Sequence, residues 1–294
     1  MKVAVIDIGS NTVKMDVFNV NGKEFFLISS KSEKGALVKY RKDSRLTEEG
    51  FAVLHTLLEK YITQAASSGC EKTYVFATQS LRNIENADDV CERIKTALGV
   101  HIDIISGKEE ALYSFYALAS ECKETDEGIM ADMGGGSLEL ADFSNKEYIS
   151  LCSVPLGALH VKETLGIGMI PSDTDEEKIR NYVSDVLKDV PTKNMDTVFM
   201  IGGTARTAFS ICFEGKTEVS LADAEKAYSI LSASKEKTFK LLSAKASKRA
   251  DNFMTGFYVF ITLCKHFGAS KLALCKASVR DGYLAHALKK EDIE

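Results

Sequence analysis

Two stretches of the sequence repeat one arrangement of a carboxylate and a small-residue turn. They are AVIDIGSNTVKMDVF at residues 4–18 and IMADMGGGSLELADF at residues 129–143, and they align at a constant offset that places Asp7 against Asp132. Small residues let the backbone approach a ligand closely, and several N–H groups of such a turn can bind one anion. Two such turns, each with a carboxylate two residues ahead, predict paired phosphate-binding loops with a metal ion between them.

The residues after each turn alternate between apolar and polar, so we expect each turn to be the tip of a β-hairpin. This placement counts against a dinucleotide-binding fingerprint or a P-loop, because those glycine-rich loops precede a helix. A single Asp-x-Gly turn would favour a plain structural hairpin; the matched pair favours ligand binding. The predicted phosphate-binding residues are Gly9, Ser10, Asn11 and Thr12 in the first loop and Gly134, Gly135, Gly136 and Ser137 in the second.

Composition narrows the class of protein. The chain has 294 residues and a net charge of −5, which favours two domains and argues against a general DNA-binding protein. The longest apolar run, around residues 257–264, is too short to cross a bilayer, and no signal peptide is evident. The seven cysteines lack a C-x-x-C spacing, which indicates reduced thiols in a cytoplasmic protein.

Strands and helices must position the two loops, and their predicted order starts again after the first 120 residues. We expect a boundary in the polar run at residues 123–128, giving an N-terminal domain at 1–124 and a C-terminal domain at 125–294 with helical insertions. The last helix could pack back on the first domain. Expected strands lie at 3–7, 13–18, 24–29, 72–78, 101–106, 128–133, 138–143, 147–154, 197–203 and 271–275. Expected helices lie at 47–66, 87–98, 109–120, 156–165, 175–190, 204–211, 221–231, 236–242, 250–267 and 279–288.

Further sequence blocks give the two loops a family context. FATQSLRNIEN, IISGKEEA, SVPLGALHV, IGGTARTA and SVRDGYL follow in the order typical of one family and cover nearly the whole chain. The chain resembles the exopolyphosphatase/guanosine pentaphosphate phosphatase family, in its short two-domain form. This family belongs to the acetate kinase, sugar kinase, heat-shock chaperone and actin superfamily. The resemblance implies an α/β fold of two actin-like (ribonuclease H-like) domains. Each domain would hold a mixed five-stranded sheet with helices, and the active site would lie in the cleft between them.

The resemblance also implies a metal-dependent phosphoanhydride hydrolase that releases terminal phosphate from inorganic polyphosphate. It places the catalytic base on the second glutamate of SGKEEA, Glu110; from the sequence alone, an acidic residue there merely favours the helix dipole. Mg²⁺ or Mn²⁺ is the expected cofactor, with Asp132, Glu139 and Asp7 as its carboxylates.

Other residues are candidate ligands for phosphate, each with a structural alternative. The guanidinium of Arg82 suits phosphate in fork geometry, or it is a surface group at a strand end. Gly157 could bring the LGA backbone close to substrate, and Gly203 with Thr204 could bind distal phosphates or form a tight turn. The family usually has arginine at His160, so a permanent cation is lost there. The basic run at residues 235–249 could bind a polyanion or be a solvated helix face.

Alternatives to the hydrolase remain open. A guanosine pentaphosphate 5′-phosphohydrolase would use the same residues on a nucleotide. An ATP-dependent kinase or chaperone-like ATPase would bind adenosine near residues 202–206, and a polyphosphate or alarmone sensor would bind without releasing phosphate. We expect a homodimer in each case.

Overall fold

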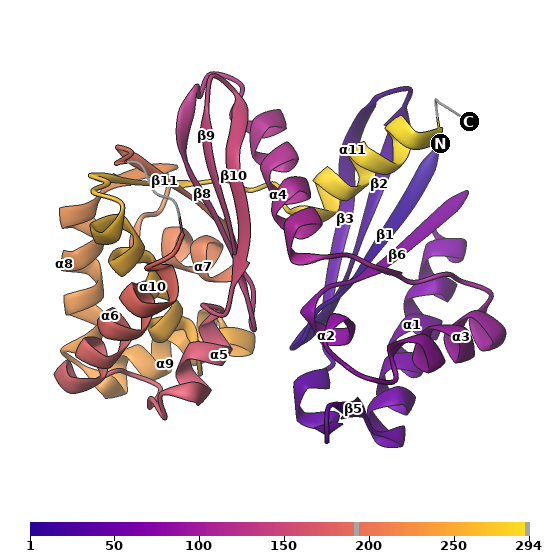
Figure 1. The fold of residues 1–294 in the computed structure, drawn as a ribbon, viewed down its shortest axis with the longest axis horizontal. Helices are drawn as coiled ribbons and strands as arrows, with labels where there is room; N and C mark the ends of the chain where they lie inside the picture. The colour runs from indigo at the N-terminus through magenta and orange to yellow at the C-terminus, as the bar shows by residue number, and fades with distance from the viewer. Residues whose placement is uncertain (191–193, 292–294) are drawn as a thin grey trace. The chain divides into compact units, whose positions relative to one another are not determined.

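The computed structural model describes residues 1–190 and 194–291 (Figure 1). The chain forms two compact units, one from Met1–Glu110 joined by the chain from Gly282 onward, the other from Ala111–Asp281. The division lies inside helix α4 (Gly107–Glu121), earlier than the expected boundary at residues 124 and 125. The helical pattern of α4 continues across the division, but its later residues Phe115 and Leu118 pack in a core cluster of the second unit.

The first unit is built on a five-stranded mixed sheet, as expected, in the order β3-β2-β1-β6-β7. β1 pairs antiparallel with β2 and parallel with β6, so β1 lies at the centre of the sheet. Alternate residues of β1, namely Ala4, Ile6 and Ile8, join one buried cluster with α1 and α3. The strands are β1 (Lys2–Ile8), β2 (Thr12–Asn21), β3 (Glu24–Lys34), β6 (Lys72–Ala77) and β7 (Asp103–Ile104), with a separate pair β4 (Arg41–Lys42) and β5 (Arg45–Leu46).

Helices α1, α3 and α11 of the first unit begin within one residue of the predicted starts, whereas η1 and α2 were not predicted. Thr47 caps α1 (Glu48–Ser67) by accepting a hydrogen bond from the Gly50 N–H at 3.2 Å. Helix α11 (Val279–Glu291) returns to this unit, where Tyr283 stacks on Phe76 with ring centroids 4.6 Å apart. The remaining elements are the 3-10 helix η1 (Leu37–Tyr40), α2 (Gln79–Arg82) and α3 (Ala87–Leu98).

The second unit is built on a mixed sheet in the order β10-β9-β8-β11-β13-β12. Five strands were expected here, and the sixth is β12 (Glu218–Ser220), antiparallel to β13. Three residues are too few to show an alternating pattern, which is why the sequence does not reveal this strand. The other strands are β8 (Glu127–Met133), β9 (Leu138–Ser144), β10 (Glu147–Val154), β11 (Thr197–Gly202) and β13 (Lys271–Leu274).

Helices cover the second sheet around the almost wholly buried helix α10 (Phe253–His266). Its Phe257 and Phe260 are completely buried in the main core cluster of this unit. In the described part of the chain, no helix combines the length and apolar character that crossing a bilayer requires. The other helices are α5 (Ala158–Thr164), α6 (Asp173–Leu187), α7 (Gly203–Cys212), α8 (Leu221–Ser232), α9 (Lys235–Lys245) and the 3-10 helix η2 (Ser247–Arg249).

Candidate active site

The repeated stretches form the same hairpin turn in both units. In the first loop, residues 9–12 between β1 and β2, the Gly9 N–H donates to the carbonyl of Thr12 at 3.1 Å. In the second loop, residues 134–137 between β8 and β9, the Gly134 N–H donates to the carbonyl of Ser137 at 2.9 Å. The sequence repeat is therefore also a repeat of backbone geometry, and both turns are tips of antiparallel hairpins as expected.

The two hairpins differ in the residue paired with the aspartate. Asp7 is in register with Lys14, whose Nζ lies 3.6 Å from Asp7 Oδ2. Asp132 is in register with Glu139, so the second hairpin places two carboxylates on neighbouring strands. A cation beside Asp7 competes with a metal ion for that carboxylate, whereas two carboxylates attract one. The geometry thus favours the second hairpin for metal binding and gives Asp7 an ion-pair partner.

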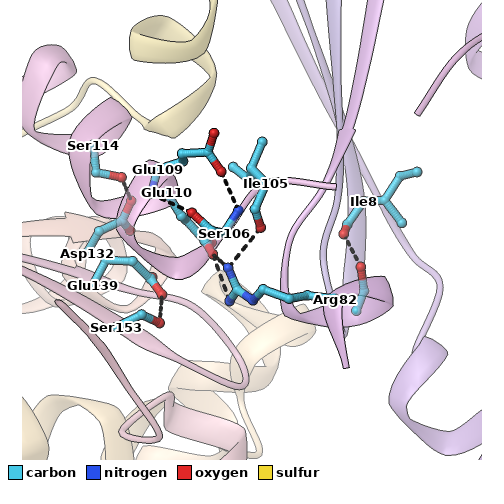
Figure 2. A network of polar contacts seen from close by, with 11 residues as sticks. Ile8, Arg82, Ile105, Ser106, Glu109, Glu110, Ser114, Asp132, Glu139 and Ser153 are labelled. Carbon is cyan, nitrogen blue, oxygen red and sulfur yellow. Dashed lines mark hydrogen bonds and ion pairs between the residues drawn. The ribbon is translucent and has the colours of Figure 1, made fainter. Parts of the chain in front are cut away.

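Both carboxylates of the second hairpin accept a hydrogen bond from a serine hydroxyl (Figure 2). Ser114 Oγ of α4 donates to Asp132 Oδ2 at 2.7 Å, and Ser153 Oγ of β10 donates to Glu139 Oε1 at 2.8 Å. Asp132 is half-buried and Glu139 is 1% exposed. Neither serine was predicted from the sequence, because serines on a helix and an edge strand show no pattern that relates them to distant carboxylates.

This pair of carboxylates fits a divalent ion such as Mg²⁺. Mg²⁺ is commonly held by one or two carboxylates, with waters and substrate phosphate oxygens completing its shell. Within residues 1–190 and 194–291 there is no group of three or more His, Cys, Asp or Glu side chains able to hold a metal. Asp132 and Glu139 therefore suit an ion that binds together with phosphate rather than one enclosed by protein alone.

The second loop is braced from behind by the first turn of α5. The Ala158 N–H donates to the carbonyl of Gly134 at 3.2 Å, and the Leu159 and His160 N–H groups donate to that of Gly135, both at 2.9 Å. In a trans peptide the C=O and N–H point in opposite directions, so these bonds direct the next two N–H groups away from α5. Those N–H groups belong to Gly135 and Gly136 and contact no acceptor in the described residues. They are well suited to bind an anion.

Gly157 allows this bracing. A Cβ added at Gly157 would lie 2.4 Å from the carbonyl carbon of Gly136 and 2.6 Å from that of Gly135. From the sequence, the Gly157 backbone is expected to approach substrate. The structure shows it against the loop itself, so any role of Gly157 in phosphate binding would be exerted through the loop.

The first loop is braced in a similar way by the segment after β3. The Val38 N–H donates to the carbonyl of Ser10 at 3.1 Å, and the Gly35 and Ala36 N–H groups donate to that of Asn11 at 3.1 and 2.9 Å. In both units the segment following the third strand of the sheet thus fixes the loop of the preceding hairpin. This relation was not predicted, because the sequence does not show which segment packs against each loop.

The two adjacent glutamates at the start of α4 have different environments. Glu109 Oε2 accepts from the Ser106 N–H at 2.7 Å, and the Glu109 N–H donates to Ser106 Oγ at 3.2 Å, which is a reciprocal cap. The hydrogen bond from the Ser106 backbone lowers the pKa of Glu109. The structural alternative raised for Glu110, a carboxylate that only stabilises the helix start, thus describes Glu109.

Glu110 is instead held by Arg82 of α2 (Figure 2). Nη1 and Nη2 of Arg82 both lie 3.2 Å from Glu110 Oε2, and Nη1 also donates to the carbonyl of Ile105 at 3.0 Å. Ser80 of α2 donates to the carbonyl of Ile8 beside the first loop, which anchors the short helix that carries Arg82. Both side chains of the pair are mostly buried, so Arg82 is no free surface group.

A comparison with known protein families identifies the family of this chain. Residues 17–291 match the model of the Ppx/GppA phosphatase family. The chain belongs to this family. Its sequence is 30% identical to exopolyphosphatase 1 of Mycobacterium tuberculosis over 161 residues, which cover 54% of this chain and 47% of that protein. The chain spans about half the length of these curated relatives.

Other relatives match along nearly the full chain. The guanosine-5′-triphosphate,3′-diphosphate pyrophosphatase of Photobacterium profundum is 21% identical over 98% of this chain and 59% of that protein. The crystal structure of the Aquifex aeolicus Ppx/GppA family member superimposes with a TM-score of 0.84 at 23% identity, covering 99% of both chains. The crystal structure of an exopolyphosphatase from Cytophaga hutchinsonii superimposes with a TM-score of 0.83 at 20% identity, covering 99% of this chain and 98% of that one. These likenesses confirm the predicted mixed α/β fold.

A second candidate phosphate site lies at the start of α7, where Gly203 and Thr204 are predicted to bind distal phosphates. A Cβ at Gly203 would lie 1.9 Å from the guanidinium carbon of Arg249, so the glycine lets that guanidinium lie against the helix start. Burial, and then the charge of Arg206, lower the pKa of Arg249. A half-buried guanidinium at a helix N-terminus is attractive to phosphate. In the sequence, Arg249 is distinguished only as the last residue of the basic run at residues 235–249.

His160 stands where the family that the chain resembles usually has arginine, and its side chain contacts a neighbouring helix. The ring lies in the first turns of α5, and its Nε2 is 3.2 Å from the hydroxyl of Tyr182 in α6. The imidazole thus contacts a neutral partner of its own unit, while its backbone N–H braces the second loop. The backbone of His160 therefore contacts the second loop, while its side chain contacts α6.

Proposed function

We propose that the protein is a divalent-metal-dependent exopolyphosphatase. It releases the terminal phosphate of inorganic polyphosphate by attack of water on phosphorus, with cleavage of the bond to the bridging oxygen. Membership of the Ppx/GppA phosphatase family supports the reaction class. The observation that carries the assignment of residues is the contrast between Glu109, used as a helix cap, and Glu110, held by Arg82.

In this proposal Glu110 accepts the proton of the attacking water while Arg82 keeps its carboxylate oriented. The N–H groups of the first and second loops and the hydroxyls of Ser10, Thr12 and Ser137 bind phosphate oxygens. Asp132 and Glu139 hold the divalent ion, Mg²⁺ or Mn²⁺, which supplies positive charge to phosphate oxygens when bound. Asp7 supports the first loop through its ion pair with Lys14.

A second candidate activity is removal of the 5′-terminal phosphate of guanosine pentaphosphate. Two observations favour it: the similarity to the Photobacterium profundum enzyme over 98% of the chain, and the guanidinium of Arg249 against Gly203. This site could bind phosphates distal to the one released.

A phosphate-release panel tests the proposal. Short and long polyphosphate, guanosine pentaphosphate, ATP and pyrophosphate are compared with Mg²⁺, with Mn²⁺ and with excess chelator. We expect metal-dependent phosphate release, with the highest kcat/KM on polyphosphate. Higher kcat/KM with the nucleotide would support the second activity, and tight binding without release at any metal concentration would identify a sensor. Homodimer formation and cytoplasmic location are also part of the proposal, and light scattering after gel filtration and cell fractionation test them.

A further inference from the structure

Ser114 is a buried polar residue on the helix that carries Glu110. It has no exposed surface, and its neighbour Phe115 packs against Phe143 with ring centroids 5.5 Å apart. A buried hydroxyl requires a hydrogen-bond partner, and that of Ser114 is the carboxylate of Asp132 at 2.7 Å (Figure 2). Alanine would fill this position of the helix without any need for a partner, so the serine contributes mainly through that bond.

The hydrogen bond gives the two oxygens of Asp132 different surroundings. Oδ2 accepts from Ser114, while Oδ1 lies toward Gly202, where an added Cβ would be 3.3 Å away. A hydrogen bond from a hydroxyl to a carboxylate is strong and charge-assisted, and it restricts rotation of the carboxyl group. Without it, the half-buried Asp132 would lose one restraint on the orientation of its carboxyl group, and a bound ion would have to supply that restraint.

We infer that Ser114 is a positioning residue for metal binding, which fixes the carboxylate of Asp132 through its hydroxyl. The inference rests on the proposed function in assigning a divalent ion to Asp132 and Glu139. Ser114 follows Glu110 by four residues in α4, one helical turn or about 6 Å along the axis. The helix whose first turn carries the proposed base therefore also carries the group that orients a metal carboxylate.

The test measures metal binding separately from catalysis. Mn²⁺ binding to the full chain is followed by electron paramagnetic resonance of free Mn²⁺ and by calorimetry, for wild type, Ser114→Ala and Ser114→Thr. Groups that orient metal ligands typically change affinity by about 10- to 100-fold, so Ser114→Ala should raise the Kd for Mn²⁺ at least about tenfold. Ser114→Thr keeps the hydroxyl and should stay within about threefold of wild type, because the same charge-assisted bond can form.

The control is Thr262→Val, which removes another buried hydroxyl hydrogen bond, that to the carbonyl of Tyr258 at 2.8 Å. This variant should lose a similar amount of stability without change in the Kd for Mn²⁺. If Ser114→Ala does not fold, Ser114→Cys supplies the comparison, since a thiol is only a weak donor of similar size. Melting curves of all variants identify the folded ones.

The outcomes separate this inference from the proposed function. An unchanged Kd in the folded Ser114→Ala or Ser114→Cys variant overturns the role of Ser114, even if wild type releases phosphate. A wild-type protein that binds no Mn²⁺ overturns it as well. Weakened Mn²⁺ binding in Ser114→Ala with rescue by threonine supports it, and it does so even if no substrate of the panel is hydrolysed, which would overturn only the proposed reaction.

Discussion

Arg82 donates from both Nη1 and Nη2 to a single oxygen of Glu110, Oε2, at 3.2 Å, while Nη1 also contacts the carbonyl of Ile105 at 3.0 Å. The guanidinium thus connects the proposed base to the segment just before α4. The sequence predicts a phosphate ligand at Arg82, and that role stays a prediction. The observed contact gives Arg82 the additional function of orienting Glu110.

Glu110→Gln should nearly abolish phosphate release. The amide keeps the shape of the side chain but cannot accept the proton of water, and loss of a general base typically costs about 10²- to 10⁴-fold in kcat. The control is Glu109→Gln, since glutamine can still serve in a capping box; its kcat should stay within about twofold of wild type. Equal loss of kcat in both variants would contradict the separation of roles seen at the start of α4.

Arg82→Lys should lower kcat about tenfold, or about 1.4 kcal/mol of transition-state stabilisation, with little change in KM. One ammonium group cannot reproduce the planar fork that reaches both Glu110 and Ile105. Steady-state kinetics on polyphosphate measure both constants. A raised KM with unchanged kcat would show that Arg82 acts on substrate phosphate and not through Glu110.

Arg93 provides the matched control for this substitution. Its Nη1 and Nη2 contact the two carboxylate oxygens of Glu48 at 2.9 and 2.7 Å on the surface of the same unit. Arg93→Lys should leave kcat and KM unchanged, because this exposed pair involves Glu48 at the start of α1 rather than Glu110, and exposed ion pairs are weak.

Gly157→Ala should displace the second loop. The added Cβ would meet backbone atoms of Gly135 and Gly136 at 2.4 to 2.6 Å, and backbone cannot yield as a flexible side chain can. We expect a loss of about 1–3 kcal/mol in the free energy of unfolding and a larger loss in kcat/KM, measured by denaturant titration and phosphate release. Gly168→Ala is the control, since its nearest atom would be 3.9 Å away; full activity of Gly157→Ala would refute the bracing role.

Ser172→Ala should destabilise α6 in a pH-dependent way. Ser172 and Asp175 form a capping box, and hydrogen bonds from the Ser172 side chain and backbone, together with one from Lys178, lower the pKa of Asp175 from 3.8 to about 2. A carboxyl group whose pKa is lowered by folding stabilises the folded state fully above its unfolded pKa. The stabilisation is lost as the pH falls toward the folded pKa.

The cost of Ser172→Ala should therefore be about 1 kcal/mol at pH 7 and shrink as the pH falls from about 4 toward 2. Thermal melts at several pH values measure it. Ser220 caps α8 by accepting from the Asp223 N–H at 3.1 Å without the reciprocal bond, so Ser220→Ala should cost a similar amount with a weaker dependence on pH. Parallel pH profiles for the two variants would contradict this account of Asp175.

Much of the architecture is local and could be predicted. Helix α3 has the expected bounds, Ala87–Leu98, and α1 starts after the predicted cap Thr47. Alternation and small-residue turns identify both hairpins, because these patterns arise within one segment. Less regular elements were missed: the expected strand at residues 101–106 is reduced to β7 (Asp103–Ile104), and β12 was not predicted.

By itself, the sequence determines the repeated loops, the family blocks and the identities of the candidate residues. Only the tertiary structure decides which of them contact one another. Glu109 and Glu110 are adjacent in the sequence and chemically identical. Their contacts differ because α2 brings Arg82 to Glu110, whereas Glu109 caps the start of α4. Ser114 meets Asp132, and α5 meets the second loop, through packing across chain intervals that carry no pattern. The preference of a segment for helix or strand is visible in its sequence periodicity, because it arises within that segment. Which side chains contact one another depends on how the elements pack.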